Sequence, residues 1–211
     1  MLLGFNGSPK PDSNLRRIIE MMLQESGQDY QIYDLANMNI KPCIGCVKCA
    51  KTNRCVMEDD MKPLYDEIVS AEGIVVGAVA YFKKTNGFTH NFLERLFPLR
   101  HLHPQTTGKL AVAVAVGGNE AEPVCDEISY HLNSYFDFKI QDKFFFNTMT
   151  PPCFICGFGT ECNYGGPARW MSPEDFKNFN EITPEMFQKF EDHDDSVKQV
   201  KEIGRRLGNL K

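Results

Sequence analysis

Two continuous apolar runs limit most strongly what this chain can fold into. Residues 73–80 read Gly-Ile-Val-Val-Gly-Ala-Val-Ala, and residues 110–116 form a second run of the same kind. A strand that is apolar at successive positions is buried on both faces, as in a parallel sheet covered by helices. The sequence therefore predicts two central strands of a parallel sheet.

Three further strand-like segments, at residues 2–5, 30–35 and around 144–146, alternate with amphipathic helical segments. Helices are expected to begin at Ser13 or Asn14, at Asp59 or Asp60 and near Pro123, to stop at Pro98, and to close the chain around residues 197–207. Strands that alternate with helices favour an α/β fold with right-handed crossovers. We expect a single domain, residues 1–211, built on a doubly wound five-stranded parallel sheet.

Four unusual loops follow the predicted strands, at residues 7–14, 43–55, 81–87 and 117–120. In open parallel sheets, ligands bind outside the carboxyl ends of the strands. The sequence therefore predicts a binding site at this edge, with all four loops beside it.

The first loop, from Gly7 to Asn14, has the composition of an anion site. Ser8, Ser13 and Asn14 supply side-chain donors, and the loop opens a helix whose first N–H groups carry partial positive charge. It matches neither the Walker motif nor G-x-G-x-x-G, so the usual ATP and dinucleotide fingerprints are absent. An ordinary strand-to-helix turn with a good cap is an equal alternative.

Four cysteines in the second loop, Cys43, Cys46, Cys49 and Cys55, follow the spacing C-x2-C-x2-C-x5-C. Thiolates are soft ligands that select zinc, copper(I) or iron–sulfur clusters. One compact run differs from the two separate knuckles of a four-cysteine zinc site. It is closer to the bacterial ferredoxin run, with a longer last gap and no following proline. An iron–sulfur cluster is favoured; zinc, a disulfide and an unliganded loop are the alternatives.

Composition narrows the partners. The chain has 42% hydrophobic and 24% charged residues and a net charge of −5, which gives no electrostatic reason to expect nucleic acid or an anionic membrane. No apolar run is long enough to span a bilayer, and the first residues lack the features of a targeting segment. Eight cysteines in such a chain are expected to be reduced ligands in the cytoplasm.

A second cysteine-rich segment, residues 150–171, follows the fifth strand and is expected at the same edge of the sheet. Cys153, Cys156 and Cys162 supply three thiols, and Cys125 is a candidate fourth ligand. A second metal or cluster is one interpretation. The alternatives are that these cysteines cover the ligand pocket or that Cys153 and Cys156 form a redox pair. Residues 163–170 are interpreted as a lid or a subunit interface.

With these loops placed, residues 1–150 resemble the flavodoxin-like NAD(P)H-dependent FMN reductase superfamily, and the compact cysteine run resembles its iron–sulfur flavoprotein branch. Gly7-Ser8-Pro9 with Ser13-Asn14 is similar to the family's FMN phosphate loop. Ala80-Tyr81-Phe82 with Asn86-Gly87 is similar to the loop at the isoalloxazine edge, with Ala80 in place of a common proline and an unusual Lys83-Lys84 pair. Gly117-Gly118-Asn119 is similar to the third flavin loop.

The resemblance implies FMN as a cofactor and a [4Fe–4S] cluster on residues 41–57, in a homodimer or homotetramer. The FMN-binding residues that it implies are Ser8, Pro9, Ser13, Asn14, Leu15, Ala80, Tyr81, Phe82, Lys83, Asn86, Gly87, Gly117, Gly118 and Asn119. The implied cluster ligands are Cys43, Cys46, Cys49 and Cys55.

The function that follows is an oxidoreductase that couples one-electron transfer from ferredoxin, or electrons from NAD(P)H, to two-electron flavin chemistry on a small acceptor. Two alternatives stay open: a non-catalytic electron carrier, and an NAD(P)H-dependent FMN or quinone reductase in which zinc holds the cysteine loop. No nucleophilic catalytic residue is expected.

Overall fold

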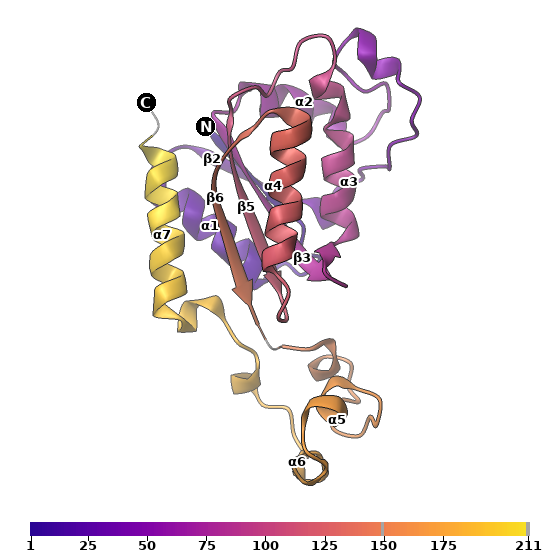
Figure 1. Cartoon of the computed structure of the whole chain (residues 1–211), viewed down its shortest axis with the longest axis vertical. Helices are drawn as coiled ribbons and strands as arrows, with labels where there is room; N and C mark the ends of the chain where they lie inside the picture. Colours follow the sequence, from indigo (N-terminus) through magenta and orange to yellow (C-terminus); the bar gives the residue numbers. More distant parts are fainter. Residues whose placement is uncertain (149, 210–211) are drawn as a thin grey trace.

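The computed structural model describes residues 1–148 and 150–209; residue 149 and the last two residues of the predicted domain lie outside the described part. Five parallel strands pair in the order β2-β1-β3-β5-β6 (Figure 1). The predicted five-stranded, doubly wound sheet is thereby confirmed. The strands are β1 (Leu2–Asn6), β2 (Tyr30–Asp34), β3 (Gly73–Tyr81), β4 (Lys84–Thr85), β5 (Leu110–Gly117) and β6 (Lys139–Asn147).

β4 was not expected from the sequence. It folds back antiparallel on β3, pairing Lys84 with Tyr81 and Thr85 with Ala80. Phe82 and Lys83 form the connecting turn with φ of 52° and 65°. Two residues with positive φ suit the tight hairpin turn that right-twisted strands require, although neither is the glycine or asparagine that normally signals it. The loop after β3 is therefore a short hairpin.

Helices cover both faces of the sheet (Figure 1). The helices are α1 (Asn14–Glu25), α2 (Met61–Ser70), α3 (Gly87–Arg95), α4 (Glu122–Phe136), α5 (Gly166–Trp170), α6 (Pro173–Asn178) and α7 (Asp194–Gly208). Short 3₁₀ turns lie at Leu35–Asn37, Lys48–Lys51, Phe97–Arg100, Pro152–Phe154, Pro184–Met186 and Phe190–Asp192. None of the helices in the described ranges is long and apolar enough to cross a membrane.

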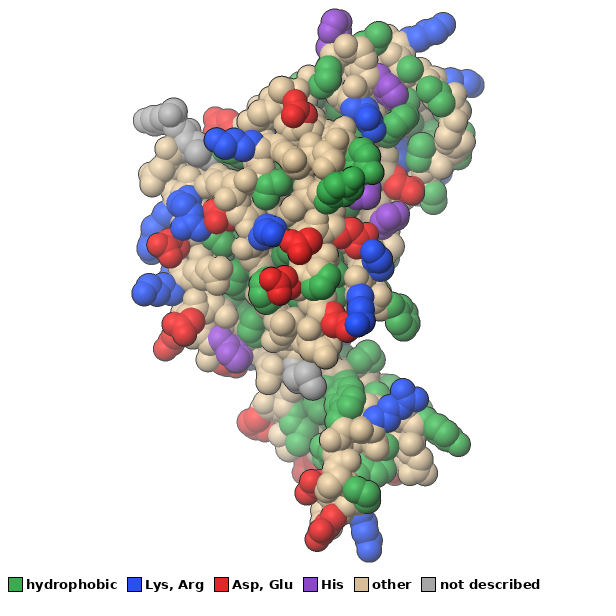
Figure 2. Space-filling model, viewed as in Figure 1, with side chains coloured by type: hydrophobic (Ala, Val, Ile, Leu, Met, Phe, Trp, Pro, Cys, Tyr) green, Lys and Arg blue, Asp and Glu red, His purple; other side chains and the backbone are tan. Residues whose placement is uncertain are grey.

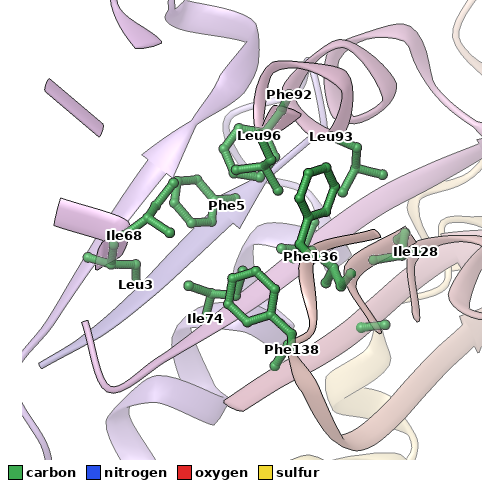
Figure 3. Close-up of a cluster of buried hydrophobic side chains, with 14 of the residues drawn as sticks. Leu3, Phe5, Ile68, Ile74, Phe92, Leu93, Leu96, Ile128, Phe136 and Phe138 are labelled. Carbon is green, nitrogen blue, oxygen red and sulfur yellow. The ribbon is translucent and has the colours of Figure 1, made fainter. Parts of the chain in front are cut away.

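Two apolar layers hold the sheet. One cluster joins Phe5 and Ile74 of the sheet to α2, α3 and α4; its aromatic members include Phe92, Phe136 and Phe138 (Figure 3). The other cluster joins Val75, Val112 and Val114 to α1 and α7. Successive residues Ile74 and Val75 therefore belong to opposite layers, which explains why the β3 run is apolar without interruption.

Helix starts follow their local chemistry. Ser13 caps α1, since its hydroxyl accepts a hydrogen bond from Arg16 N at 3.1 Å, as the sequence predicts. α3 begins at Gly87, ahead of the apolar residues that signal it, and ends at Arg95; Pro98 lies in the following 3₁₀ turn. The amino end of α3 therefore lies beside the end of β3.

A C-terminal extension, residues 150–193, lies beyond the carboxyl ends of the strands (Figure 1). It contains α5 and α6, and it returns to the sheet before α7, which packs against α1. Hydrophobic side chains gather on its surface (Figure 2), among them Phe158, Tyr164 and Trp170, which are 68%, 85% and 56% exposed. The extension therefore adds a wall to the edge of the sheet where ligands are expected.

Candidate functional site

A cavity of about 860 Å³ lies at the carboxyl edge of the sheet, where the loops after β1, β3, β5 and β6 meet the C-terminal extension. Of the residues predicted for this site, the cavity is lined by Ser8, Pro9, Ser13, Asn14, Leu15, Ala80, Tyr81, Gly117, Gly118 and Asn119. Three of the four loops expected at this edge therefore contribute to one site.

The loop after β1 is shaped by its own hydroxyl groups. Ser8 Oγ accepts a hydrogen bond from Lys10 N at 3.2 Å, while Ser8 N donates to Asn6 Oδ1 at 3.1 Å. The loop leads into the capped amino end of α1, where partial positive charge favours an anion. Lys10 and Lys189 also line the cavity and add cationic groups to its wall.

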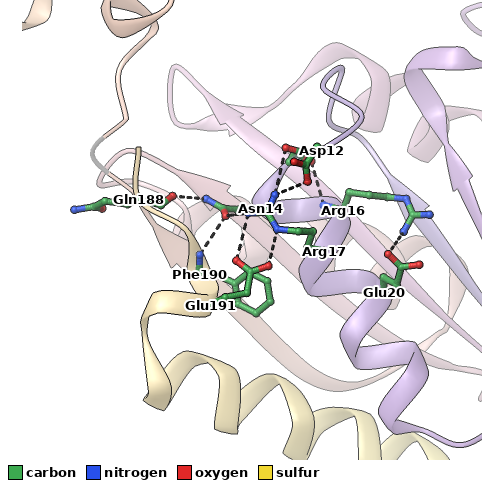
Figure 4. A network of polar contacts seen from close by, with 9 residues as sticks. Asp12, Asn14, Arg16, Arg17, Glu20, Gln188, Phe190 and Glu191 are labelled. Atoms are coloured by element: carbon green, nitrogen blue, oxygen red, sulfur yellow. Dashed lines mark hydrogen bonds and ion pairs between the residues drawn. The ribbon is translucent and has the colours of Figure 1, made fainter. Parts of the chain in front are cut away.

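Asn14 and Arg17 link this loop to the C-terminal extension (Figure 4). Asn14 Nδ2 donates to Gln188 O at 2.9 Å, and Asn14 Oδ1 accepts from Phe190 N at 3.1 Å. Arg17 Nε donates to Glu191 at 2.5 Å. The Asn14 amide is thus engaged with the return segment, a role that the sequence pattern did not indicate.

Electrostatics supports the same link. Burial alone would lower the pKa of Arg17, but its hydrogen bonds to Glu191 and Asp12 raise that pKa above its ordinary value. Arg17 NH1 lies 2.7 Å from Asp12 Oδ1, within the loop after β1. One guanidinium therefore ties both this loop and residue 191 to α1.

The hairpin after β3 divides its predicted residues between three places. Ala80 and Tyr81 line the cavity. Phe82 projects into solvent and is fully exposed, at 100%, while Lys83 Nζ turns to Glu120 at 2.6 Å. Neither Phe82 nor Lys83 is among the cavity-lining residues.

Asn86 has an internal role. It is 2% exposed, its Nδ2 donates to Gly7 O at 2.6 Å, and its Oδ1 accepts from Val79 N at 3.3 Å. Its amide therefore joins the loop after β1 to the end of β3, and it does not line the cavity. Gly87, the next residue, begins α3 and is also outside the cavity wall.

The loop after β5 needs its first glycine. A Cβ at Gly117 would lie 2.7 Å from Ala80 Cβ, which is closer than two carbon atoms can approach. A Cβ at Gly118 would meet nothing within 4 Å, so the backbone there faces the open cavity. Thr148 N donates to Gly117 O at 2.7 Å and joins this loop to the end of β6.

Several other wall residues were not predicted to bind the cofactor, although one alternative has Cys156 covering the pocket and another has the segment that contains Trp170 as a lid. They come from the loop after β6 and the return segment: Thr148, Thr150, Pro151, Pro152, Ile155, Cys156, Trp170, Phe187, Gln188 and Lys189. For the residues of the loop after β6, the sequence did offer a signal, namely the position of the cysteine-rich segment directly after the fifth strand. The return segment carries no such signal, because its place at the cavity depends on contacts made in the folded chain, among them those with Asn14, Arg17 and Thr150 and the burial of Phe190.

The first cysteine loop lies elsewhere, and this corrects the sequence-based expectation. Cys43, Cys46, Cys49 and Cys55 line a separate small cavity with Glu94, Arg95, Phe97 and Pro98, at the carboxyl end of α3. The large cavity lies at the other end of this helix, beside Gly7 and Asn86. Nine residues of helix are roughly 13 Å long, so the two sites of one chain are distinct.

A buried ion pair determines where this loop runs. Arg95 NH1 lies 2.6 Å from Asp59 Oδ2 and donates to Lys41 O at 2.5 Å, and both side chains of the ion pair are at most 2% exposed. Asn53 Nδ2 donates to Pro98 O at 3.0 Å. These contacts fix residues at both ends of the loop and inside it against the end of α3.

The four thiols lie near one another. Burial raises the pKa of Cys49, and the neighbouring Cys55, Cys46 and Cys43 raise it further. Within residues 1–148 and 150–209, no group of three or more His, Cys, Asp or Glu side chains is arranged to hold a metal ion. The cysteine side chains are thus not preset at metal-coordination distance. Their chemistry nonetheless fits a thiophilic metal or cluster, because four cysteine sulfurs line one cavity.

The structure answers part of the question about Cys153, Cys156 and Cys162, the second group of cysteines. Cys153 Sγ accepts a hydrogen bond from Gly166 N at 3.0 Å, and Cys156 lines the large cavity. Cys125 does not join them, contrary to the interpretation that made it a fourth ligand. It is 1% exposed, its thiol donates to Phe144 O at 3.0 Å, and burial raises its pKa to about 12. Cys125 is kept away from the other cysteines because it lies on the buried face of α4, which packs on the sheet.

Comparison with known proteins finds a matching family and several relatives. The family described as NADPH-dependent FMN reductase matches residues 1–141. An iron-sulfur flavoprotein of Methanocaldococcus jannaschii is 31% identical over 121 residues, which cover 56% of this chain and 62% of that protein. One from Methanosarcina thermophila is 29% identical, covering 56% and 63%. The matches thus span less than two thirds of these relatives.

Among solved structures, the two-electron reduced flavodoxin of Megasphaera elsdenii superposes with a TM-score of 0.54 at 12% identity, covering 100% of both chains. At this identity the likeness concerns the fold alone. It agrees with the strand order of the sheet.

Proposed function

Because this chain belongs to the NADPH-dependent FMN reductase family, we propose that it is a flavin-dependent oxidoreductase of the iron–sulfur flavoprotein type that binds FMN in the large cavity. The observation that carries the proposal is the meeting of the loops after β1, β3, β5 and β6 around one cavity of about 860 Å³, with a capped helix start on its wall. This volume lies in the range of cofactor pockets.

The cavity wall fits the parts of FMN. Ser8, Ser13 and the first N–H groups of α1, with Lys10 and Lys189, supply donors and positive charge for a phosphate. Ala80 and Tyr81 together with the bare backbone of Gly117 and Gly118 supply a surface against which a planar ring can lie.

Bound FMN would supply electron transfer in steps of two or of one. The protein's residues position the cofactor and exclude water from it. Tyr81, Trp170 and Phe187 line the cavity, and the N–H group at Gly118, beyond the last paired residue of β5, is a donor that can stabilise negative charge. Lys83, paired with Glu120 outside the cavity, is not assigned a part in this chemistry.

The test is flavin content and selectivity. We expect about one FMN per chain, and we expect FMN-free protein to bind FMN at least tenfold more tightly than riboflavin, because riboflavin lacks the phosphate. Ser13→Ala should reduce this preference. Equal affinity for FMN and riboflavin would show that the loop after β1 is not a phosphate site.

We further propose a [4Fe–4S] cluster on Cys43, Cys46, Cys49 and Cys55. The support is the four-thiol donor set in one cavity together with the names of the archaeal relatives. Iron, acid-labile sulfide and zinc should be measured on anaerobically purified protein. About four iron and four sulfide per chain are expected; zinc without sulfide would leave a flavin reductase with a zinc-held loop.

The separation of the two sites shapes the proposed electron route. Because the cysteine loop and the FMN cavity lie at different ends of α3, we propose a homodimer or homotetramer in which electrons pass from the cluster of one copy to the cavity of another. Ferredoxin or NAD(P)H is the proposed donor and a small molecule the proposed acceptor. Light scattering tests the oligomer; turnover with small acceptors separates the enzyme from an electron carrier.

A further inference from the structure

The cysteines of the C-terminal extension have no part in the proposed function, yet one of them faces the FMN cavity. Cys156 is exposed and lines the cavity. Cys156 N donates to Pro152 O at 3.1 Å, so residues 152–156 form one helical turn. Positions three apart on such a turn are neighbours. Cys156 Sγ also donates to Cys153 O at 3.3 Å, so the thiol of Cys156 lies against the residue that would be its disulfide partner.

Local hydrogen bonds hold the two sulfur atoms. Gly166 N donates to Cys153 Sγ at 3.0 Å, and Phe158 N donates to Cys156 Sγ at 3.4 Å. Gly157, between these groups, has a φ of 83°, which lets the chain turn directly after Cys156. The backbone around both cysteines is thus folded about the sulfur atoms.

The third cysteine is placed differently. A Cβ at Gly165 would lie 3.3 Å from Cys153 Sγ and 3.5 Å from Cys162 Cβ, so Cys162 lies near Cys153. Unlike Cys156, Cys162 is not among the residues that line the cavity. A relay between a thiol pair and a ligand in the cavity therefore needs Cys156, and Cys153, which does not line the cavity either, is its neighbour on the same turn.

We propose that Cys153 and Cys156 form a redox-active pair that exchanges two electrons with the flavin cofactor; this rests on the proposed function. In the reducing direction, the S–S bond between them breaks. The two sulfurs take up two electrons and two protons from reduced FMN, which is thereby oxidised, and two thiols result. The pair stores one two-electron equivalent beside the cavity.

A metal on all three thiols is the competing interpretation. In the described ranges neither cysteine group is preset around a metal ion, so metal analysis of the protein, and not this finding, separates the two interpretations. The redox pair requires only two sulfurs and the cavity wall, both of which the geometry supplies.

The first experiment locates the disulfide in the purified holoprotein, equilibrated with glutathione buffers and then alkylated. Trypsin releases residues 144–169 as one peptide, which holds Cys153, Cys156 and Cys162 and none of the first cysteine loop. Cleavage after Glu161 then separates Cys162 from the other two. We expect the two fragments to come apart, with Cys153 linked to Cys156 in the first.

Variants sharpen this assignment. Cys153→Ser and Cys156→Ser should each abolish the linked species, whereas Cys162→Ser should retain it. Three outcomes would each overturn the proposal. The fragments stay joined through Cys162, or no link forms at any glutathione ratio. In the third, zinc or iron is retained after Cys43→Ser has emptied the first cysteine loop.

The second experiment follows electrons. Bound FMN is reduced anaerobically by light with EDTA, which does not itself reduce disulfides, and free thiols in residues 144–169 are counted. We expect two new thiols per chain with FMN and none in FMN-free protein. If FMN does not bind, the proposed function fails while the first experiment still decides the disulfide. If FMN binds and is reduced but no thiols appear, the redox pair is wrong and the proposed function stands.

Discussion

At the scale of single residues, Cys125 and Cys156 show how burial determines thiol chemistry. Cys125 is 1% exposed and its pKa is raised to about 12, so the folded protein holds it as a neutral thiol at neutral pH. Cys156 is exposed on the cavity wall. We expect iodoacetamide at pH 8 to modify Cys156 in the reduced protein and to modify Cys125 only after unfolding in urea.

Peptide mass spectrometry separates the two sites, because trypsin places Cys125 between Lys109 and Lys139 and Cys156 between Lys143 and Arg169. Modification of Cys125 at a rate similar to that of Cys156 would show that α4 does not bury it in solution.

Two adjacent glycines give a matched pair of substitutions. A Cβ at Gly117 would lie 2.7 Å from Ala80 Cβ, whereas one at Gly118 meets nothing within 4 Å. We expect Gly117→Ala to lower the free energy of unfolding by about 1–3 kcal/mol. Gly118→Ala should change it by less than about 0.5 kcal/mol, as for an unobstructed position.

Urea unfolding of both variants, each without FMN, measures these free energies. The FMN affinity of Gly118→Ala should nonetheless fall, since its methyl group enters the cavity. Equal stabilities for the two variants would contradict the close approach of the loops after β3 and β5.

The buried pair Arg95 and Asp59 gives the largest expected effect. Their side chains are 2% and 0% exposed, and Asp59 lies beyond the end of the cysteine loop. Arg95→Met leaves a buried carboxylate without its partner, which costs about 3–5 kcal/mol. The double variant Arg95→Met/Asp59→Leu should recover part of this loss in urea unfolding. A double variant no more stable than Arg95→Met would contradict a purely electrostatic origin.

The pH dependence of the pair follows from its pKa shift. Burial alone would raise the pKa of Asp59, but hydrogen bonds from Arg95 hold it below its ordinary value. The folded carboxylate therefore binds its proton at lower pH than the unfolded one. Its contribution is present above the unfolded pKa of about 3.9 and is lost as the pH falls through the folded pKa.

At the scale of elements, the extension is held to α1 by the buried side chain of Phe190 and by a few polar contacts. Asn14 bonds both Gln188 O and Phe190 N, and Arg17 bonds Glu191 (Figure 4). Asn14→Ala removes two of these bonds and should increase proteolytic cleavage of residues 150–193 severalfold. The melting temperature of the sheet should change little. Lys143→Ala, which breaks the exposed ion pair with Asp126, is the control and should leave the cleavage rate unchanged.

The elements also show which parts of the molecule were predictable. The sheet and the start of α1 follow from local signals, namely the apolar runs and the hydroxyl of Ser13. The path of the cysteine loop depends on Arg95 and Asn53, which meet it only in the folded chain. The spacing of apolar residues along the sequence gives no indication of such long-range contacts. The β3 hairpin was missed because Phe82 and Lys83 adopt positive φ without the usual turn residues.

At the scale of the whole molecule, the sites at the two ends of α3 should behave independently within one chain. Their lining residues do not overlap. Substitutions at distant sites without shared partners usually act additively. We expect Cys43→Ser and Cys49→Ser to lose the bound iron while changing the FMN dissociation constant less than about twofold, roughly 0.4 kcal/mol.

The outcome also decides how the copies of an oligomer meet. If the cysteine loop of one copy forms part of the FMN cavity of another, loss of the loop's order should weaken FMN binding tenfold or more, a change of about 1.4 kcal/mol. The same variants in monomeric form, obtained by dilution, should then bind FMN as the unsubstituted monomer does. A tenfold loss that persists at dilution would mean that the two sites communicate through α3 itself, against the separation seen in this fold.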